Sequence, residues 1–336
     1  MNTYLRYNFC TLFDFKYLTR GIALYESLEK VCNKFWLYIY SFDEKTFEVL
    51  QKLNLKYATI ISKSEFETEE LKNVKKTRTL TEYFWTCSSQ IIFFTIKNFD
   101  LDHCVYLDAD VAFYSSPEAI FKEIGDYSVA ISPHNFSPNY KTLEIYGKYC
   151  VQFVFFKNDK YGLDALNWWR KSCLKWCYSR LEDEKYGDQK YLDKMFNKFK
   201  KVIEIKHLGA GIAPWNIDNY YFRKVGDNIF IKQKNNQNEK WYELIFYHFQ
   251  GLKFYNKNNE IIIYPSNLKI NKFILDEIYR DYVLKLIELE KLVLNNNLFN
   301  KELIFKRNFF YHLNFIKDIF RREKIVQLYH AIKNFK

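Results

Sequence analysis

The sequence predicts an α/β protein in which a parallel-rich central sheet carries helices on both faces. Strand-like apolar runs alternate with helix-patterned segments through the first two-thirds of the 336-residue chain, an alternation typical of sheets built from strand–helix–strand units. The last third contains a long helix-patterned stretch at 271–294. We therefore expect a large α/β domain over residues 1–265, followed by a helical C-terminal region over residues 266–336.

Each element is predicted from its own pattern. Short apolar runs rich in β-branched and aromatic residues predict strands at 4–10, 35–40, 56–62, 103–110, 126–132 and 149–157. Apolar residues at spacings of three and four predict helices at 17–30, 82–99 and 162–181, with another helix beginning in 186–196. Residues 207–216 are expected to be irregular, and 243–255 to form a strand followed by a turn at Gly251.

Charge and cysteine usage bound the partners and the compartment. The net charge of +11 favours anionic partners such as nucleotides, phosphorylated substrates or acidic lipid surfaces. No DNA- or RNA-binding signature accompanies this charge, so nucleic acid is not an expected partner. The seven cysteines are odd in number and scattered, which is typical of a reducing cytoplasm. Cys173 and Cys177 share one face of a predicted helix without further ligands nearby, and we expect buried structural thiols there.

Localisation is predicted from the N-terminus and from the tail. The N-terminus lacks a basic region followed by a long apolar stretch, so no signal peptide is expected, and no apolar run of about 18 residues predicts a membrane span. The basic tail, residues 301–336, places Phe309, Leu313, Ile316 and Phe320 on one helical face. It could lie on the inner surface of the plasma membrane or pack on the preceding domain with its basic face solvated.

Two carboxylates follow an apolar run in "VYLDADVAF". Asp108 and Asp110 stand where the strand should end, and alternate side chains of an extended backbone share a face. Carboxylates suit Mg²⁺ or Mn²⁺, and such an ion neutralises charge on a diphosphate leaving group. His248 lies at a second predicted strand end and could complete the ligand set, and Lys253 could hold a diphosphate. The alternatives are a solvated strand end, a structural histidine and a surface lysine.

Several stretches together resemble the GT-A glycosyltransferases. "VYLDADVAFYSSP" is similar to their metal-binding strand, "YHFQGLK" to the H-x-x-G-x-x-K signature of glycosyltransferase family 8, and "FCTLFDFKYLTRGIALYESL" to the opening strand and helix that cradle the nucleotide. "GDQKYLD" and "GAGIAPWN" resemble segments of bacterial capsule and lipopolysaccharide transferases. These motifs cover roughly residues 4–255 in the family's order. The resemblance implies a GT-A, Rossmann-like mixed central sheet flanked by helices.

The resemblance also implies roles for individual residues. The metal, Mn²⁺ or Mg²⁺, would be held by Asp108, Asp110 and His248. Catalysis near the anomeric carbon of the donor sugar would involve Asp188 and Gln189. The nucleotide-diphosphate-sugar donor would contact the following side chains: Thr11, Asp14, Arg20, Asp108, Gln152 and Lys253. One departure concerns the strand "CVQFVFFK", which has Gln152 and no glycine where family 8 members usually carry an N-x-G motif.

The implied reaction moves a sugar from this donor to a hydroxyl of a cell-surface glycan precursor, with retention favoured over inversion. In a retaining front-face mechanism the leaving phosphate takes the acceptor proton, whereas inversion requires a carboxylate base, for which Asp188 is the candidate. Asp188 could instead cap a helix. A sugar nucleotidyltransferase normally has a Gly-rich basic loop that "TLFDFKYLTRG" lacks. A non-catalytic nucleotide-sugar-binding protein is the alternative from another class.

Further aromatic and polar residues allow two interpretations each. His134 could contact the acceptor or be structural. Trp215 and Asn216 could shape the sugar pocket or pack as a turn on the core. The remaining tryptophans considered, Trp168, Trp169 and Trp176, are expected in the core.

Overall fold

In a computed structural model of the protein, residues 4–235, 240–257 and 260–295 are described. The chain divides into two compact units, residues 1–248 and residues 249–336, and each is described by itself. The basic tail at 301–336, including its four apolar positions, lies outside the described residues.

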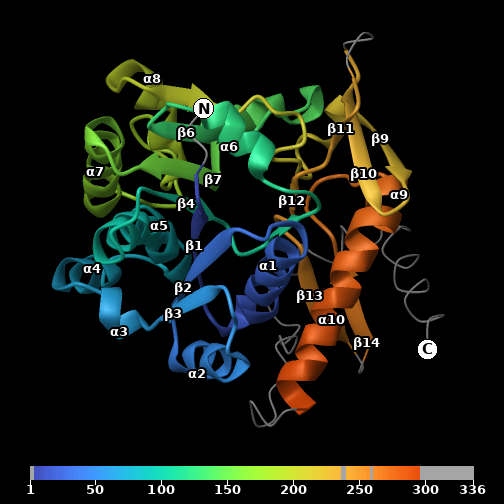
Figure 1. Cartoon of the computed structure of the whole chain (residues 1–336), viewed down its shortest axis with the longest axis horizontal. Coiled ribbons are helices and arrows are strands. Elements are labelled where there is room, and N and C mark those ends of the chain that lie inside the picture. The colour runs from blue at the N-terminus through green and yellow to red at the C-terminus, as the bar shows by residue number, and fades with distance from the viewer. Residues whose placement is uncertain (1–3, 236–239, 258–259, 296–336) are drawn as a thin grey trace. The chain divides into compact units, whose positions relative to one another are not determined.

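The first unit is built on a seven-stranded sheet with the order β3-β2-β1-β4-β7-β6-β8 (Figure 1). β3, β2, β1 and β4 run parallel, whereas β7 is antiparallel to both β4 and β6, so the sheet is mixed. This confirms the predicted mixed α/β architecture. The strands are β1 (Tyr7–Phe13), β2 (Phe35–Ser41), β3 (Ala58–Ile61), β4 (His103–Leu107), β6 (Val129–Pro133), β7 (Tyr149–Lys157) and β8 (Val202–Glu204).

Helices cover both faces of this sheet, and Figure 1 shows α1 and α5 on opposite sides of β1. The α-helices of the unit are α1 (Leu18–Val31), α2 (Glu44–Leu53), α3 (Lys63–Phe66), α4 (Glu69–Lys75), α5 (Leu80–Asn98), α6 (Glu118–Ile124), α7 (Lys160–Lys175) and α8 (Met195–Lys198). Short 3₁₀ helices are η1 (Phe15–Tyr17), η2 (Pro138–Tyr146), η3 (Gln189–Lys194) and η4 (Ile217–Asn219).

The core follows from the alternation of side chains along the buried strands. On one face, Cys10 of β1 joins Ile91 of α5 and Trp169 of α7 in a single apolar cluster. On the other face, Phe9 packs against Phe113 and Phe121, with ring centroids 6.2 and 6.0 Å away. Both faces are thus apolar, as expected for a sheet covered on each side.

Two smaller sheets complete the first unit. β5 (Val111–Phe113) pairs antiparallel with β12 (Phe246–His248), which brings the two predicted motif segments together. A three-stranded antiparallel sheet contains β9 (Tyr220–Val225), β10 (Asn228–Gln233) and β11 (Tyr242–Glu243).

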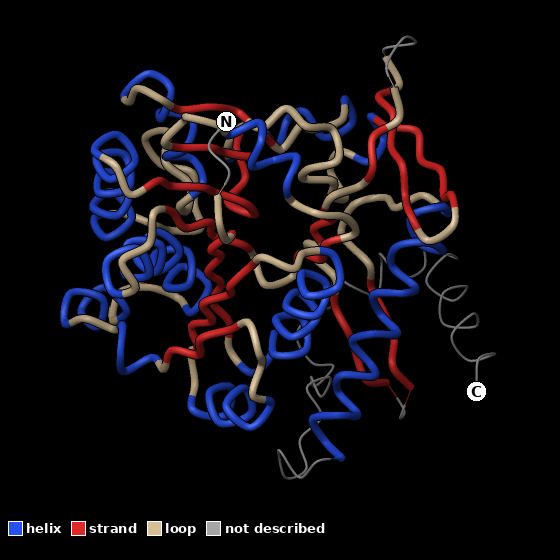
Figure 2. Tube along the Cα trace, in the orientation of Figure 1, coloured by secondary structure: helices blue, strands red, loops and turns tan. Residues whose placement is uncertain are grey.

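The second unit contains a hairpin and a long helix, both visible in Figure 2. β13 (Lys253–Lys257) pairs antiparallel with β14 (Glu260–Tyr264). The helix runs from α9 (Lys272–Ile274) through a π-helical turn (Leu275–Tyr279) into α10 (Arg280–Asn295), as predicted for 271–294. Within the described ranges, no helix has the length and apolar character needed to cross a membrane.

Three predicted elements are shorter than expected. β4 ends at Leu107 because the next residues form a turn closed by the Val111 N–H donating to the Asp108 carbonyl over 3.2 Å. α7 ends at Lys175, since Trp176 adopts an extended backbone, so the expectation that Cys173 and Cys177 share a helix face is wrong. The segment 186–196 is largely a 3₁₀ helix and not an α-helix. All seven cysteines are free and buried, which confirms the expectation of buried thiols at Cys173 and Cys177.

The first turn of α7 packs on the backbone of the sheet at Gly162, which leads to a prediction. A Cβ at Gly162 would lie 2.2 Å from the Lys157 carbonyl oxygen and 3.0 Å from that of Ser128. We expect Gly162→Ala to lower the free energy of unfolding by roughly 2–3 kcal/mol through overpacking, measured by chemical denaturation. Gly226→Ala is the control: its Cβ meets nothing within 4 Å, although φ is +59°. A loss at Gly162 no larger than at Gly226 would contradict this packing.

Candidate active site

The Asp108–Asp110 turn joins β4 of the central sheet to β5 of the two-stranded sheet. The extended backbone expected for these residues is therefore not found, and the two carboxylates converge through a turn. Asp110 is buried and Asp108 is partly exposed. The turn directs both side chains to the same neighbour, His248.

His248 is placed by strand pairing from a distant part of the sequence. It lies opposite Val111 in the β5–β12 register, and its N–H donates to the Ile212 carbonyl over 2.8 Å. Its Nε2 is 3.1 Å from Asp110 Oδ1 and 3.7 Å from Asp108 Oδ2. The structure thus brings together the three side chains that the sequence predicts as metal ligands.

Gln152 fixes the orientation of the His248 ring. The Gln152 amide oxygen lies 2.9 Å from His248 Nδ1, and because an amide oxygen only accepts, Nδ1 carries the proton of this bond. Nε2 is then the ring atom that faces the carboxylates, an arrangement typical of metal-ligating histidines. Gly211 leaves space for this amide: its φ is +77°, and a Cβ there would lie 2.7 Å from Gln152 Nε2.

Asp108, Asp110 and His248 shift one another's pKa values through their charges. Burial raises the pKa of Asp108 to about 6, opposed by the nearby His248 and reinforced by Asp110. Burial also acts to raise the pKa of Asp110, but His248 and Arg20 together hold it below its usual value. Burial lowers and the two carboxylates raise the pKa of His248, and the carboxylates dominate. The buried Asp110 and the partly exposed Asp108 thus both favour the charged form of the His248 ring that lies between them.

The nucleotide-side predictions have different outcomes. Arg20 is buried on α1, its guanidinium lies 4.6 Å from the Tyr17 ring centroid, and its charge acts on Asp110. Thr11 is fully buried in β1, and its hydroxyl has no partner among the described residues. Asp14 caps η1 by accepting from the Lys16 N–H at 3.1 Å. Lys253 begins β13 in the second unit.

Asp188 is a buried acid at the N-cap position of η3. Its carboxylate accepts a 2.7 Å hydrogen bond from the Ser88 hydroxyl and makes no side-chain capping bond to η3. Its carbonyl accepts from the Trp169 indole N–H at 2.9 Å. Burial raises the pKa of Asp188 to about 7, and the charge of Asp108 raises it further against the Ser88 bond. Gln189, next along the chain, donates to the Tyr146 carbonyl over 3.0 Å.

His134, Trp215 and Asn216 form a buried support for His248. The Trp215 ring stands perpendicular to His248 at 5.4 Å and lies 5.1 Å from His134. The Trp215 indole and the Asn216 amide both donate to the His134 carbonyl, at 2.7 and 3.0 Å. Burial lowers the pKa of His134 to about 3, so its ring is neutral. These contacts favour the packing interpretation of all three residues.

One residue of the cluster was not predicted. Cys150, Asp108 and His248 each present a ligand atom within 4.8 Å of the other two. Cys150 precedes Gln152 by two positions on β7, so strand alternation turns both toward His248. The sequence signal for Cys150 was this alternation, which places it on the same side of the strand as Gln152. The signal identifies Cys150 as a neighbour of His248 only when His248 is known to face β7.

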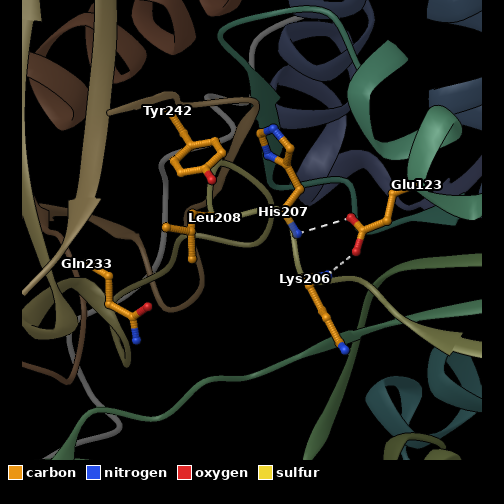
Figure 3. Close-up of a pocket in the computed structure, with 6 residues that line it drawn as sticks. All are labelled: Glu123, Lys206, His207, Leu208, Gln233 and Tyr242. Atoms are coloured by element: carbon orange, nitrogen blue, oxygen red, sulfur yellow. Dashed lines mark hydrogen bonds between the residues drawn. The ribbon is translucent and has the colours of Figure 1, made fainter. Parts of the chain in front are cut away.

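A separate pocket of about 450 Å³ lies between α6, the loop after β8 and the β9–β11 sheet (Figure 3). Both Glu123 carboxylate oxygens accept backbone N–H groups, from Lys206 at 2.7 Å and His207 at 3.0 Å. The His207 ring packs edge-on against Tyr242 at 5.4 Å. The loop continues to Ile212, whose carbonyl oxygen accepts the backbone N–H of His248. Residues 206–212 therefore contribute both to this pocket and to the support of His248. The sequence did not predict this pocket.

Fold and site together define a mixed-sheet α/β protein with a buried Asp–Asp–His cluster beyond the end of β4. The "Uncharacterized protein YfnF" of Bacillus subtilis (strain 168) is 33% identical over 258 residues, covering 74% of this chain and 83% of YfnF. The chain belongs to the same family as YfnF. YfnD of the same organism is 28% identical over 284 residues, covering 83% of this chain and 88% of YfnD. No family model matches the chain.

Solved structures give a partial similarity in shape. The galactosyltransferase LgtC, in complex with donor and acceptor sugar analogs, is 16% identical with a TM-score of 0.41 over 59% of this chain and 72% of LgtC. An active-site mutant of LgtC is 12% identical with a TM-score of 0.48 over 73% of this chain and 88% of LgtC. The glycosyltransferase GlyE of Streptococcus pneumoniae TIGR4 is 14% identical with a TM-score of 0.38, over 60% and 46%.

The buried state of Asp188 predicts how stability depends on pH. With a folded-state pKa of about 7, Asp188 destabilises the fold increasingly from about pH 4, where the unfolded carboxyl ionises, to about pH 7. Asp188→Asn removes this ionisation, so the variant should gain about 1.4 kcal/mol relative to the parent per pH unit in that window. Denaturant unfolding at several pH values, with EDTA present, measures the gain.

Asp164→Asn, on the exposed face of α7, serves as the control for this experiment. It makes the same Asp-to-Asn change at an exposed position, away from the buried acid. A gain at Asp188 that does not grow between pH 4 and pH 7 would contradict the buried acid.

Proposed function

We propose that this chain is a metal-dependent GT-A glycosyltransferase. It would transfer a sugar from a nucleotide-diphosphate donor to a hydroxyl of a glycan acceptor. The observation that carries the proposal is the convergence of Asp108, Asp110 and His248, three residues of the motifs that resemble this class. A purely structural ion pair would need one carboxylate, whereas two carboxylates and an imidazole form a ligand set.

The residues present fit a divalent cation. Two carboxylates offer hard oxygen atoms and His248 offers Nε2, a combination that suits Mn²⁺ or Mg²⁺. Gln152 already holds Nδ1, which leaves Nε2 on the side of the carboxylates. The cation would replace the positive charge that the imidazolium now supplies, so His248 would become neutral on binding.

When bound, the ion would supply Lewis-acid stabilisation to the diphosphate leaving group. The protein's own contribution begins with excluding water and fixing geometry around that group. Arg20 adds positive charge near Asp110. We propose that Thr11, Asp14 and Gln152 lie along the donor, and that Lys253 of the second unit holds the diphosphate as a point charge.

Asp188 and Gln189 are proposed to act near the donor sugar. An oxocarbenium-like centre is stabilised by a nearby carboxylate or amide, and the Ser88 hydroxyl holds the Asp188 carboxylate in one orientation. We propose retention, with the leaving phosphate accepting the proton of the acceptor hydroxyl. Inversion is the second candidate, because a buried carboxyl whose pKa is about 7 suits a general base at neutral pH.

The acceptor is proposed to be a cell-surface glycan, as in capsule or lipopolysaccharide synthesis. This part of the proposal is supported by the resemblance of "GDQKYLD" and "GAGIAPWN" to transferases of that kind. A cytoplasmic location, and contact of residues 301–336 with the membrane surface, stay predictions.

The metal role is tested by Asp110→Asn. Loss of one anionic ligand should weaken Mn²⁺ binding at least tenfold, followed by electron paramagnetic resonance of free Mn²⁺, and should remove metal-dependent hydrolysis of the nucleotide sugar that the parent turns over best. The exposed Asp164→Asn is the matched control and should bind Mn²⁺ as the parent does. Unchanged Mn²⁺ affinity in Asp110→Asn would refute the metal site.

A panel of nucleotide sugars separates the proposed transferase from its rivals. Turnover of at least one donor, dependent on Mn²⁺ or Mg²⁺, is expected, and the anomeric configuration of the product distinguishes retention from inversion. Metal-dependent nucleotide binding without any turnover would instead favour a non-catalytic binding protein. Release of pyrophosphate from a nucleoside triphosphate would favour a nucleotidyltransferase.

A further inference from the structure

Cys150 faces the Asp108–His248 pair from the central sheet. It lies on β7 opposite Ser132 of β6, at the point where the β6–β7 register shifts. Such irregularities re-aim side chains and occur frequently beside functional sites. Gln152, two residues on, bonds the His248 ring, so this side of β7 presents both residues to the same imidazole.

The spacing of the three groups fits coordination of one ion. The ligand atoms of Asp108, Cys150 and His248 all lie within 4.8 Å of one another. Metal–ligand bonds of about 2.0–2.3 Å in a tetrahedral site place ligand atoms roughly 3.4–3.8 Å apart. The 3.7 Å between His248 Nε2 and Asp108 Oδ2 already meets this spacing, and the Cys150 thiol lies within 4.8 Å of a ligand atom of each of them.

The chemistry of this set differs from that of a site made only of oxygen and nitrogen. A thiolate is a soft ligand that selects Zn²⁺, Co²⁺ or Cd²⁺, whereas Mg²⁺ avoids sulfur. Asp110 and Cys150 thus offer alternative partners to the same Asp108–His248 pair. Binding through sulfur requires loss of the thiol proton to solvent as the metal–sulfur bond forms.

The other cysteines lack this environment. Cys10 neighbours Cys104, and Cys173 neighbours Cys177, as pairs of buried thiols. Among the described cysteines, Cys150 alone joins a group of three ligand side chains, together with Asp108 and His248. Cys150 is therefore distinguished by its neighbours and not by its burial, which all seven cysteines share.

We infer that Cys150 is a further metal ligand of this site, and that with Asp108 and His248 it binds a thiophilic divalent cation of the Zn²⁺ type. The inference concerns ion binding alone and holds whether or not the chain transfers a sugar. Such an ion would compete with Mn²⁺, because both use Asp108 and His248.

Cobalt reports sulfur ligation directly. Titrating the full chain with Co²⁺ should produce a near-ultraviolet thiolate-to-cobalt charge-transfer band at one equivalent. Cys150→Ser should lose this band, while Cys32→Ser, which removes a buried thiol at the end of α1, should keep it. A band that persists in Cys150→Ser, or disappears in Cys32→Ser, would overturn the assignment.

A measurement on the unsubstituted chain guards against a misfolded variant. X-ray absorption of the protein loaded with one equivalent of Zn²⁺ should show one sulfur at about 2.3 Å together with oxygen and nitrogen ligands. A shell of oxygen and nitrogen only would refute sulfur ligation.

Competition between the two ions gives a further test. Zn²⁺ should release bound Mn²⁺ from the parent at a concentration at least tenfold lower than from Cys150→Ser, and equal concentrations would also refute sulfur ligation. Asp110→Asn should keep the cobalt band even where Mn²⁺ binding is lost.

Discussion

The site depends on the antiparallel pairing of β5 with β12. This short pairing holds His248 opposite Val111, one residue beyond Asp110, and so brings an imidazole to two carboxylates that would otherwise repel each other. Neither strand belongs to the seven-stranded sheet. The central sheet supplies Asp108 from the end of β4 and Gln152 from β7. The two-stranded sheet supplies His248, whose positive charge balances the carboxylates. Removing His248 would leave the Asp110 carboxylate as an uncompensated buried charge, which is strongly destabilising.

Around this pairing the packing is arranged so that the His248 ring has one orientation. Gln152 holds one ring nitrogen and Trp215 stands perpendicular to the ring. Asn216 closes the loop by donating to the carbonyls of His134 and Gly211. The network is not complete among the described residues, because His134 Nδ1 and Gln152 Nε2 are buried without a hydrogen-bond partner there.

Much of this arrangement could be predicted from sequence, and the exceptions have physical reasons. The alternation of apolar runs predicted the mixed α/β sheet. Asp108, Asp110 and His248 were grouped because each lies at a predicted strand end within a motif segment, and their role as metal ligands stays a prediction. The turn at Asp108 was missed, since two acids after a strand look alike whether the chain bends or continues. Cys150 was missed because only its contact with His248, 98 positions away in the sequence, marks it as a candidate ligand. The position of Lys253 relative to the cluster stays a prediction.

The long sequence separation between Asp110 and His248, 138 positions, also bears on how the protein folds. Closing so long a loop costs conformational entropy before any contact rewards it. We therefore expect the cluster to form late, after the strands of the central sheet have assembled. In that order of events, we expect a cation that needs both Asp110 and His248 to bind only after the central sheet has formed. The imidazolium of His248 then acts as an internal counter-ion for the Asp110 carboxylate. It lets the newly made chain reach its native state before any metal is bound.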